Sequence, residues 1–207
     1  MYVFPDYLPE FKDLLLAVPL GLLGALAGAI FILAFRWLRK LMQPMHKHLV
    51  WRGLIGGLGL GIAGAFMPLI LFSGEDQTLV LIDSAGEIGA ASLISLALVK
   101  LFITSLCLVT GWKGGYIFPT MFAGVALGMA ANLLFPSIPV AVAVAATMGG
   151  VMVATLKAPI FSALFVMTLV QHETSPVIAI AVIVGALSTA RLSLTSANQV
   201  SATATGA

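Results

Sequence analysis

Long apolar runs separated by short polar links dominate this sequence. Residues 14–35 contain no charge, and two further apolar runs cover residues 53–72 and 88–110. A bilayer core is about 30 Å thick, and about 20 apolar helical residues are needed to cross it. The runs therefore predict three membrane-spanning helices and an all-α fold.

The second half of the chain predicts helices of uneven length. Residues 114–156 contain no charge, but Pro136 and Pro139 divide them into two helices. Residues 160–170 and 176–190 are apolar runs too short for a comfortable span. Channels and secondary transporters use such helices to bring helix ends to the middle of the membrane. The predicted fold is therefore a polytopic transmembrane helical bundle with short, tilted or re-entrant helices.

The polar links carry signals for helix boundaries. Residues 73–77 (S-G-E-D-Q) are expected to form a solvated turn; alternatively, Glu75 and Asp76 screen or repel anions at a pore mouth. Residues 84–87 (S-A-G-E) fit a capping box and predict that the third spanning helix begins there. The Ser-Pro pair at 175–176 predicts an N-cap followed by a proline at the first helical position.

Composition supports a membrane protein and excludes other classes. Hydrophobic residues make up 60% of the chain and charged residues 9%, against roughly a quarter charged in a typical soluble domain. The net charge is only +2 and the basic residues are scattered, so no nucleic-acid partner is expected. The single cysteine, Cys107, excludes an internal disulfide and is interpreted as a small core residue.

The densest basic cluster links the first two spanning helices and suggests how the protein is oriented. Its members are Arg36, Arg39, Lys40, Lys47 and Arg52. By the positive-inside rule this link should be cytoplasmic in a multi-pass plasma-membrane protein. His46 and His48 lie two positions apart, so a helix would not present both to a metal ion. No metal and no cofactor is predicted.

Residues 111–128 (G-W-K-G-G-Y-I-F-P-T-M-F-A-G-V-A-L-G) are the main candidate site. The turn and helix-start residues are Gly111, Gly114, Gly115 and Pro119. Glycines permit a tight turn, and a proline in the first helical turn loses no hydrogen bond. The amides of Tyr116, Ile117 and Phe118 would then be free at the positive end of the helix dipole, where an anion can bind.

Lys100 lies in the middle of the third predicted spanning helix. An ionisable residue at that depth is costly and points to function. The structural alternative is a lysine that snorkels or pairs with a buried carboxylate, and the sequence leaves both open.

The order of these features resembles the carboxy-terminal half of the CLC family of voltage-gated chloride channels and chloride–proton antiporters. The resemblance covers about residues 2–192. It rests first on the family motif G-x-x-G-G-x-F-x-P, which Gly111, Gly114, Gly115 and Pro119 match. A basic residue stands 11 positions before the first glycine of the motif, and Lys100 matches it. A basic-Ala-Pro triplet is matched by Lys157-Ala158-Pro159. Residues 1–192 are accordingly expected to form half of a CLC-like inverted repeat, and residues 193–207 a disordered tail.

The resemblance implies a site and partners. In the family, backbone amides of this motif hold the central anion, which points to Tyr116 and Ile117. Apart from the resemblance, Lys100 or Lys157 is a candidate to raise the local potential. It also implies a homodimer formed through the short helices at 160–170 and 176–190. The other half of the family's fold, which completes the anion site, does not precede Met1. A separate amino-terminal half, a fragment, and a half-length relative with its own assembly all remain open.

The sequence departs from the family pattern at several positions. Ile117 stands at the motif's aromatic position, with Phe118 one residue later, and Thr168 stands where the family has an acidic residue. The tyrosine that contributes a hydroxyl to the family's anion site has no counterpart. These departures would change the side chains along an anion pathway, but not backbone coordination.

Two functions fit these observations. The first is a permeation component for chloride or another halide, and the second is an inactive or structural fragment that packs with a partner half or dimerises without transport. An enzyme is not expected, because the sequence offers no buried Ser/His or paired-Asp constellation.

Overall fold

The structure, a computed structural model, describes residues 7, 9–45, 47–170 and 172–192. The metal interpretation of His46 and the predicted disordered tail at 193–207 lie outside the described residues. Within them, the chain is all-helical, as predicted. The α-helices are α1 (Phe11–Met42), α2 (Leu49–Phe66), α3 (Glu75–Ile88), α4 (Ala90–Thr110), α5 (Ile117–Leu134), α6 (Val140–Leu156), α7 (Pro159–Leu169) and α8 (Ser175–Ser188). Short 3₁₀ turns, η1 (Gln43–Met45), η2 (Pro68–Ile70) and η3 (His172–Thr174), join some of them.

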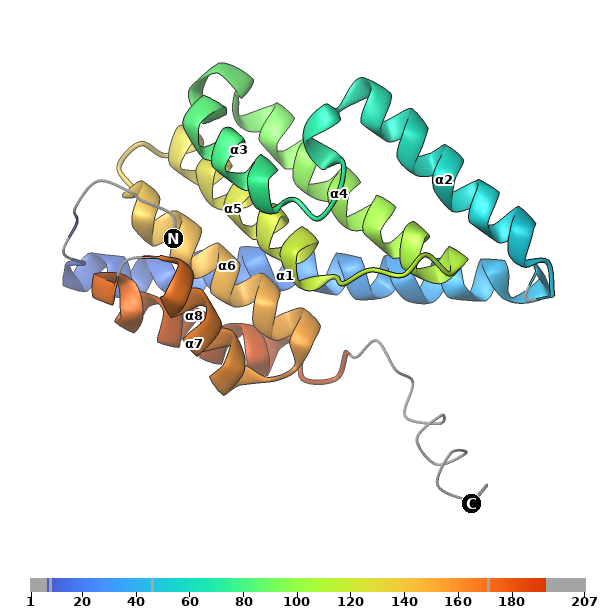
Figure 1. Cartoon of the computed structure of the whole chain (residues 1–207). Helices are drawn as coiled ribbons and strands as arrows, with labels where there is room; N and C mark the ends of the chain where they lie inside the picture. Colours follow the sequence, from blue (N-terminus) through green and yellow to red (C-terminus); the bar gives the residue numbers. More distant parts are fainter. Residues whose placement is uncertain (1–6, 8, 46, 171, 193–207) are drawn as a thin grey trace.

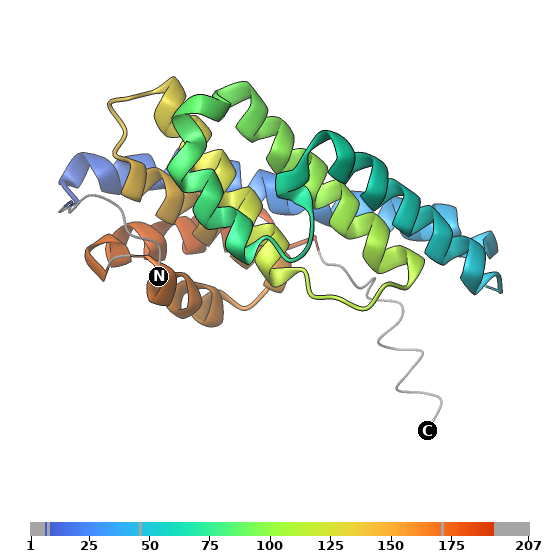
Figure 2. The same cartoon turned by 45° about the horizontal axis from the view of Figure 1, so that its top comes forward.

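Helices α5 and α6 form the centre of the bundle (Figures 1 and 2). Both are apolar all round, and every residue of α5 from 119 to 131 and of α6 from 141 to 155 is buried. A helix without a polar face must be covered on all sides. Helices α3 and α4 cover one side of this pair, α7 and α8 the other, and α1 runs across the back (Figure 1).

Among the described residues, four helices are long and apolar enough to cross a membrane: α1 with η1, α2, α4 and α5. Helices α6, α7 and α8 are shorter, which confirms the predicted mixture of long and short helices. Helix α1 has 32 residues and is about 48 Å long, so it must tilt or extend beyond the hydrocarbon core.

Small residues bring α1 directly against α6. A Cβ atom on Gly24 would lie 2.2 Å from the Thr147 carbonyl oxygen, and one on Gly150 would lie 2.2 Å from the Gly21 carbonyl oxygen. The two backbones are therefore in contact, with no room for side chains between them. This is the close packing expected of small residues in membrane helices.

The segment between α2 and α4 differs from the prediction. Helix α2 ends at Phe66, before the expected limit at residue 72, because Pro68 begins a 3₁₀ turn and Phe72 has φ 56°. Residues 75–77 form the first turn of α3, so the solvated turn predicted at 73–77 is wrong beyond Gly74. Residues 84–87 lie inside α3 and do not start the next helix, which begins after Gly89, a glycine with φ 79°.

The shorter helices begin close to where the sequence placed them. The prolines at 136 and 139 do separate α5 from α6, and Pro139 is the N-cap of α6. The N-cap of α8 is Thr174, one residue before the predicted Ser175, so Pro176 occupies the second helical position.

The contact between α1 and α6 can be tested with Gly24→Ala. The added Cβ meets a backbone carbonyl that cannot rotate away, so we expect the free energy of unfolding to fall by about 1–3 kcal/mol. Gly86→Ala in α3 is the matched control, since its Cβ meets nothing within 4 Å and alanine favours a helix by up to about 1 kcal/mol. Thermal unfolding in detergent micelles measures both; equal melting temperatures would contradict the packing described.

Candidate functional site

The linker from α4 to α5 leads into the candidate site. Helix α4 ends at Thr110. Its C-cap, Gly111, has φ 98°, and the Trp112 amide donates to the Cys107 carbonyl over 3.0 Å. Gly114 and Gly115 do not have positive φ, and an added Cβ would meet nothing within 4 Å at either position. The prediction that this glycine pair makes a tight turn is therefore wrong; Gly111 is the glycine that the turn requires.

The first turn of α5 presents free amides. Tyr116 is the N-cap, Ile117 and Phe118 are the first two helical residues, and Pro119, the third, has no N–H. The first amide bonded within the turn is that of Thr120, which donates to the Tyr116 carbonyl over 3.0 Å. Within the described part of the chain, the amides of Tyr116, Ile117 and Phe118 have no recorded acceptor.

Two neighbours fix the direction of this turn. The Thr120 hydroxyl lies 2.7 Å from the Tyr116 carbonyl oxygen and 2.8 Å from that of Ile117. The Tyr116 ring packs on Phe31 of α1, with ring centroids 5.8 Å apart. Phe31 belongs to the uncharged part of α1, so α5 begins within the apolar layer of the molecule.

A hollow of 420 Å³ adjoins the start of α5. Gly114, Gly115 and Pro119 line one side, and the turn from Ile70 to Ser73 lines another. Most of the wall is apolar; the polar side chains on it are Ser73, Thr104 and Lys113. A hollow of this size is within the range of small-ligand sites.

Lys100 is held behind the wall of this hollow. Only 1% of the residue is exposed, and its Nζ donates to the carbonyl oxygens of Ile70 (2.8 Å), Leu71 (3.3 Å) and Phe72 (2.9 Å). The same ammonium lies 5.3 Å from the centre of the Phe122 ring in α5. Neither structural alternative from the sequence applies, because Lys100 neither snorkels nor, among the described residues, pairs with a carboxylate.

These three carbonyls are the part of the site that sequence reasoning missed. They act through the backbone, so their side chains carry no signal. They converge because the chain reverses after η2, with Phe72 at φ 56° and Gly74 at φ 94°. Pro68, just after the end of α2, and the predicted turn at Ser73-Gly74 are the signals of that reversal in the sequence.

Lys157 is placed differently from Lys100. It is the C-cap of α6, at φ 58°, and its Nζ donates to the Thr189 carbonyl at the end of α8 over 2.6 Å. Its charge lies close enough to Arg36 for the two cations to interact. The structure thus gives Lys157 a structural contact between α6 and α8 and places it near the basic end of α1.

Comparisons with known proteins agree on one family. The family model described as "Voltage gated chloride channel" matches residues 1–190. Two Escherichia coli proteins named ion-transport protein YfeO, from strains O1:K1 and K12/DH10B, are 32% and 31% identical to this chain over 148 residues. Each match covers 70% of this chain and 35% of the relative, so the chain spans about a third of the length of these relatives.

A solved structure has the same fold. The crystal structure of a CLC-type fluoride/proton antiporter superimposes with a TM-score of 0.77 at 18% sequence identity, over 94% of this chain and 48% of the antiporter. At that identity the likeness concerns the fold alone. With the family model matching nearly the whole described chain, this protein belongs to the voltage-gated chloride channel (CLC) family of ion-transport proteins.

Proposed function

We propose that this chain is a permeation component for chloride or another halide. The observation that carries the proposal is the start of α5, where Tyr116, Ile117 and Phe118 have amides without recorded acceptors among the described residues, beside a hollow. Each helix of this length carries about half a positive elementary charge at its N-terminus. Unpaired amides inside an apolar layer are costly, and an anion would satisfy them.

Such a site would suit permeation better than tight binding. Amide donors and a helix dipole replace part of the hydration shell of the ion without a full countercharge in contact with it. Binding is then favourable enough for the ion to enter and weak enough for it to leave. No enzymatic step is required.

Lys100 would raise the potential at this site without touching the ion. Its ammonium donates to three carbonyls, and Lys100 is not among the residues that line the hollow. A positive charge in an apolar surrounding still acts over several ångströms, because the effective dielectric constant there is low. We assign Lys157 a lesser electrostatic role, since it contacts the end of α8.

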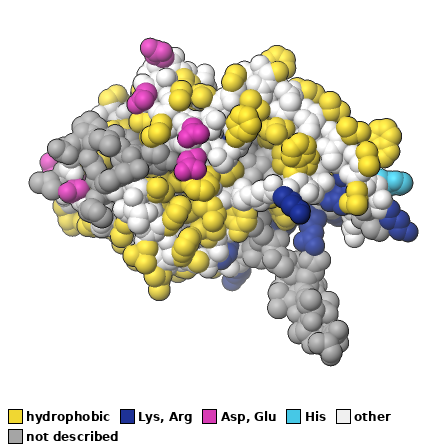
Figure 3. Space-filling model, in the orientation of Figure 1, with side chains coloured by type: hydrophobic (Ala, Val, Ile, Leu, Met, Phe, Trp, Pro, Cys, Tyr) yellow, Lys and Arg dark blue, Asp and Glu magenta, His cyan; other side chains and the backbone are white. Residues whose placement is uncertain are grey.

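The distribution of charge supports a single orientation in the membrane. In Figure 3 the visible Lys and Arg side chains gather toward the end where α1 finishes, and the visible Asp and Glu side chains lie toward the other end. Lys12 and the buried Lys100 are the exceptions; Lys12 pairs with Glu10 over 3.1 Å. The positive-inside rule places the end carrying residues 36–52 in the cytoplasm of a multi-pass plasma-membrane protein.

The site would need a second wall. This chain covers 48% of the antiporter that shares its fold, and the family resemblance implies that the remaining half completes the anion site. A separate amino-terminal half is therefore the partner we propose, together with the homodimer through α7 and α8 that the resemblance implies. The competing function is a structural fragment that assembles but passes no ions.

Halide flux from liposomes tests the proposal. We expect liposomes containing this chain with an amino-terminal partner half to release chloride or fluoride faster than empty liposomes. Ile117→Pro removes one amide at the first helical position, where proline is tolerated, and should weaken halide binding about tenfold or more. Isotope flux and halide titration of the purified protein measure the two effects.

Tyr116→Phe is the matched control, because it removes a side-chain hydroxyl and leaves the backbone amide in place. Its flux and halide affinity should equal those of the unmodified protein. If Ile117→Pro folds normally and retains full halide affinity, these amides do not bind the ion. If no preparation passes halide, the structural alternative is correct.

The role of Lys100 can be separated from its packing. Lys100→Met leaves three carbonyls without this donor, that of Ile70 in a buried position, and we expect a loss of stability of about 1–3 kcal/mol together with weaker halide binding. Lys100→Arg keeps the charge and should keep most of the affinity, even if packing suffers. Equal halide affinity in a folded Lys100→Met protein would exclude the electrostatic role.

A further inference from the structure

Each of the three tryptophans of the chain stands next to a basic residue, in the pairs Arg36-Trp37, Trp51-Arg52 and Trp112-Lys113. The first pair lies in the last part of α1, the second in the first turn of α2, and the third in the linker from α4 to α5. The three tryptophans are exposed, at 59%, 62% and 48%, respectively. Tryptophan is enriched where the hydrocarbon core meets the lipid headgroups, so these rings mark one boundary of the membrane.

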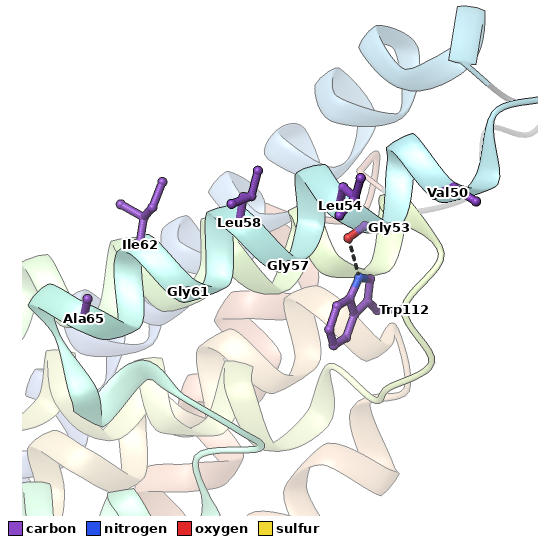
Figure 4. Close-up of a pocket in the computed structure, with 9 residues that line it drawn as sticks. All are labelled: Val50, Gly53, Leu54, Gly57, Leu58, Gly61, Ile62, Ala65 and Trp112. Atoms are coloured by element: carbon purple, nitrogen blue, oxygen red, sulfur yellow. Dashed lines mark hydrogen bonds between the residues drawn. The ribbon is translucent and has the colours of Figure 1, made fainter.

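Two contacts hold the second and third pairs side by side. The Arg52 guanidinium donates to the Val109 carbonyl in the last turn of α4. Figure 4 shows Trp112 beside the first turns of α2, where its indole N–H donates to the Gly53 carbonyl over 3.1 Å. Trp112 also lines an apolar hollow of 790 Å³ on α2. The start of α2 and the end of α4 therefore reach the membrane boundary together.

The length of α1 places its basic residues at the same boundary. Its uncharged part, from residue 14 to residue 35, is about 33 Å long at about 1.5 Å per residue. That length matches a hydrocarbon core of about 30 Å. Arg36 is thus expected at the edge of the core, and Arg39 and Lys40, one turn further along, among the headgroups.

The hairpin formed by α1, η1 and α2 is strongly basic. The sequence between residues 14 and 74 contains five basic residues and no Asp or Glu. In Figure 3 the visible acidic side chains lie toward the other end of the molecule. Lys40 and Lys47, on either side of η1, are both exposed. Carboxylates of the same segment therefore do not balance this charge, and a partner with negative charge suits it.

Apolar side chains are exposed among these lysines. They include Leu41 at the end of α1 and Leu49 and Val50 at the start of α2. A soluble phosphate compound would leave them in water. A phospholipid supplies both a phosphate for the lysines and acyl chains for the apolar side chains, which interfacial segments bury about 5–10 Å below the headgroups.

We propose that the tip of this hairpin, residues 36–45 and 47–52, binds anionic phospholipids in preference to zwitterionic ones. The lipid phosphates would lie against Lys40 and Lys47, and Trp37 and Trp51 would flank them at the edge of the acyl chains. Each basic residue close to an anionic membrane surface strengthens association about fivefold. This recognition does not depend on the proposed function in halide permeation.

Fluorescence quenching of the tryptophans measures this preference, because all three lie at the same end of the molecule. The full chain is reconstituted in phosphatidylcholine vesicles that contain a small fraction of brominated phosphatidylglycerol or, in a parallel series, brominated phosphatidylcholine. Bromine quenches indole fluorescence on contact. We expect the relative binding constant to favour phosphatidylglycerol about fivefold or more and to fall toward one at high salt, a test that needs no substitution.

Substitutions locate the preference on the hairpin. The double variant Lys40→Gln/Lys47→Gln should lose most of it, and both lysines are exposed, so glutamine leaves the packing unchanged. Lys12→Gln is the matched control, because Lys12 is an exposed lysine before the uncharged part of α1 and pairs with Glu10 over 3.1 Å. Its preference for phosphatidylglycerol should equal that of the unmodified chain.

Contrary outcomes overturn the proposal in different ways. Equal quenching by the two lipids in the unmodified chain would show that the hairpin has no preference, and quenching by neither would show that protein covers it. An unchanged preference in the double variant would place the lipid elsewhere. Inorganic phosphate at constant ionic strength should not alter the preference; if it abolishes the preference, the surface is a site for soluble phosphate.

Discussion

The direct contact between the backbones of α1 and α6 sets the position of the other helices. Gly24 and Gly150 leave no side chain between the two helices, so α6 lies at a fixed depth along α1. Helix α5 is joined to α6 by a short connection and packs along it, with Gly128 against the backbone of Val144. The start of α5 is thereby brought to Phe31, within the uncharged part of α1.

Backbone groups at helix ends inside an apolar layer need hydrogen-bond partners. Here the carbonyl groups at helix C-termini differ in this respect from the amide groups at the start of α5. Carbonyls at the ends of η2, α4 and α8 receive hydrogen bonds from Lys100, Arg52 and Lys157, respectively. A cation beside helix carbonyls is favourable because it meets the negative end of the dipole. The amides at the start of α5 have no recorded partner among the described residues, and an anion is the partner proposed for them above.

Among the described residues, Trp112 lines both the hollow on α2 and the hollow beside the start of α5. Helix α2 packs on α4 and η2 along one row of glycines, while its second row remains open beside Trp112. The hollow at the start of α5 adjoins the other side of that tryptophan.

The sequence by itself determined the helical membrane fold, the break between α5 and α6, and the motif at the start of α5. The length of an apolar run decides whether a helix can span the membrane, and a proline ends or begins a helix at its own position, so both effects are local in the sequence. It also predicted that Lys100 is important, without predicting its partners. The tertiary structure alone decided that Lys100 binds three carbonyls, that residues 84–87 lie within a helix, and that Gly114 and Gly115 are not needed for the turn. These features depend on contacts between backbone groups of segments that are distant in the sequence. Nearly every residue carries the same backbone groups, so the pattern of side chains does not predict which of them will meet.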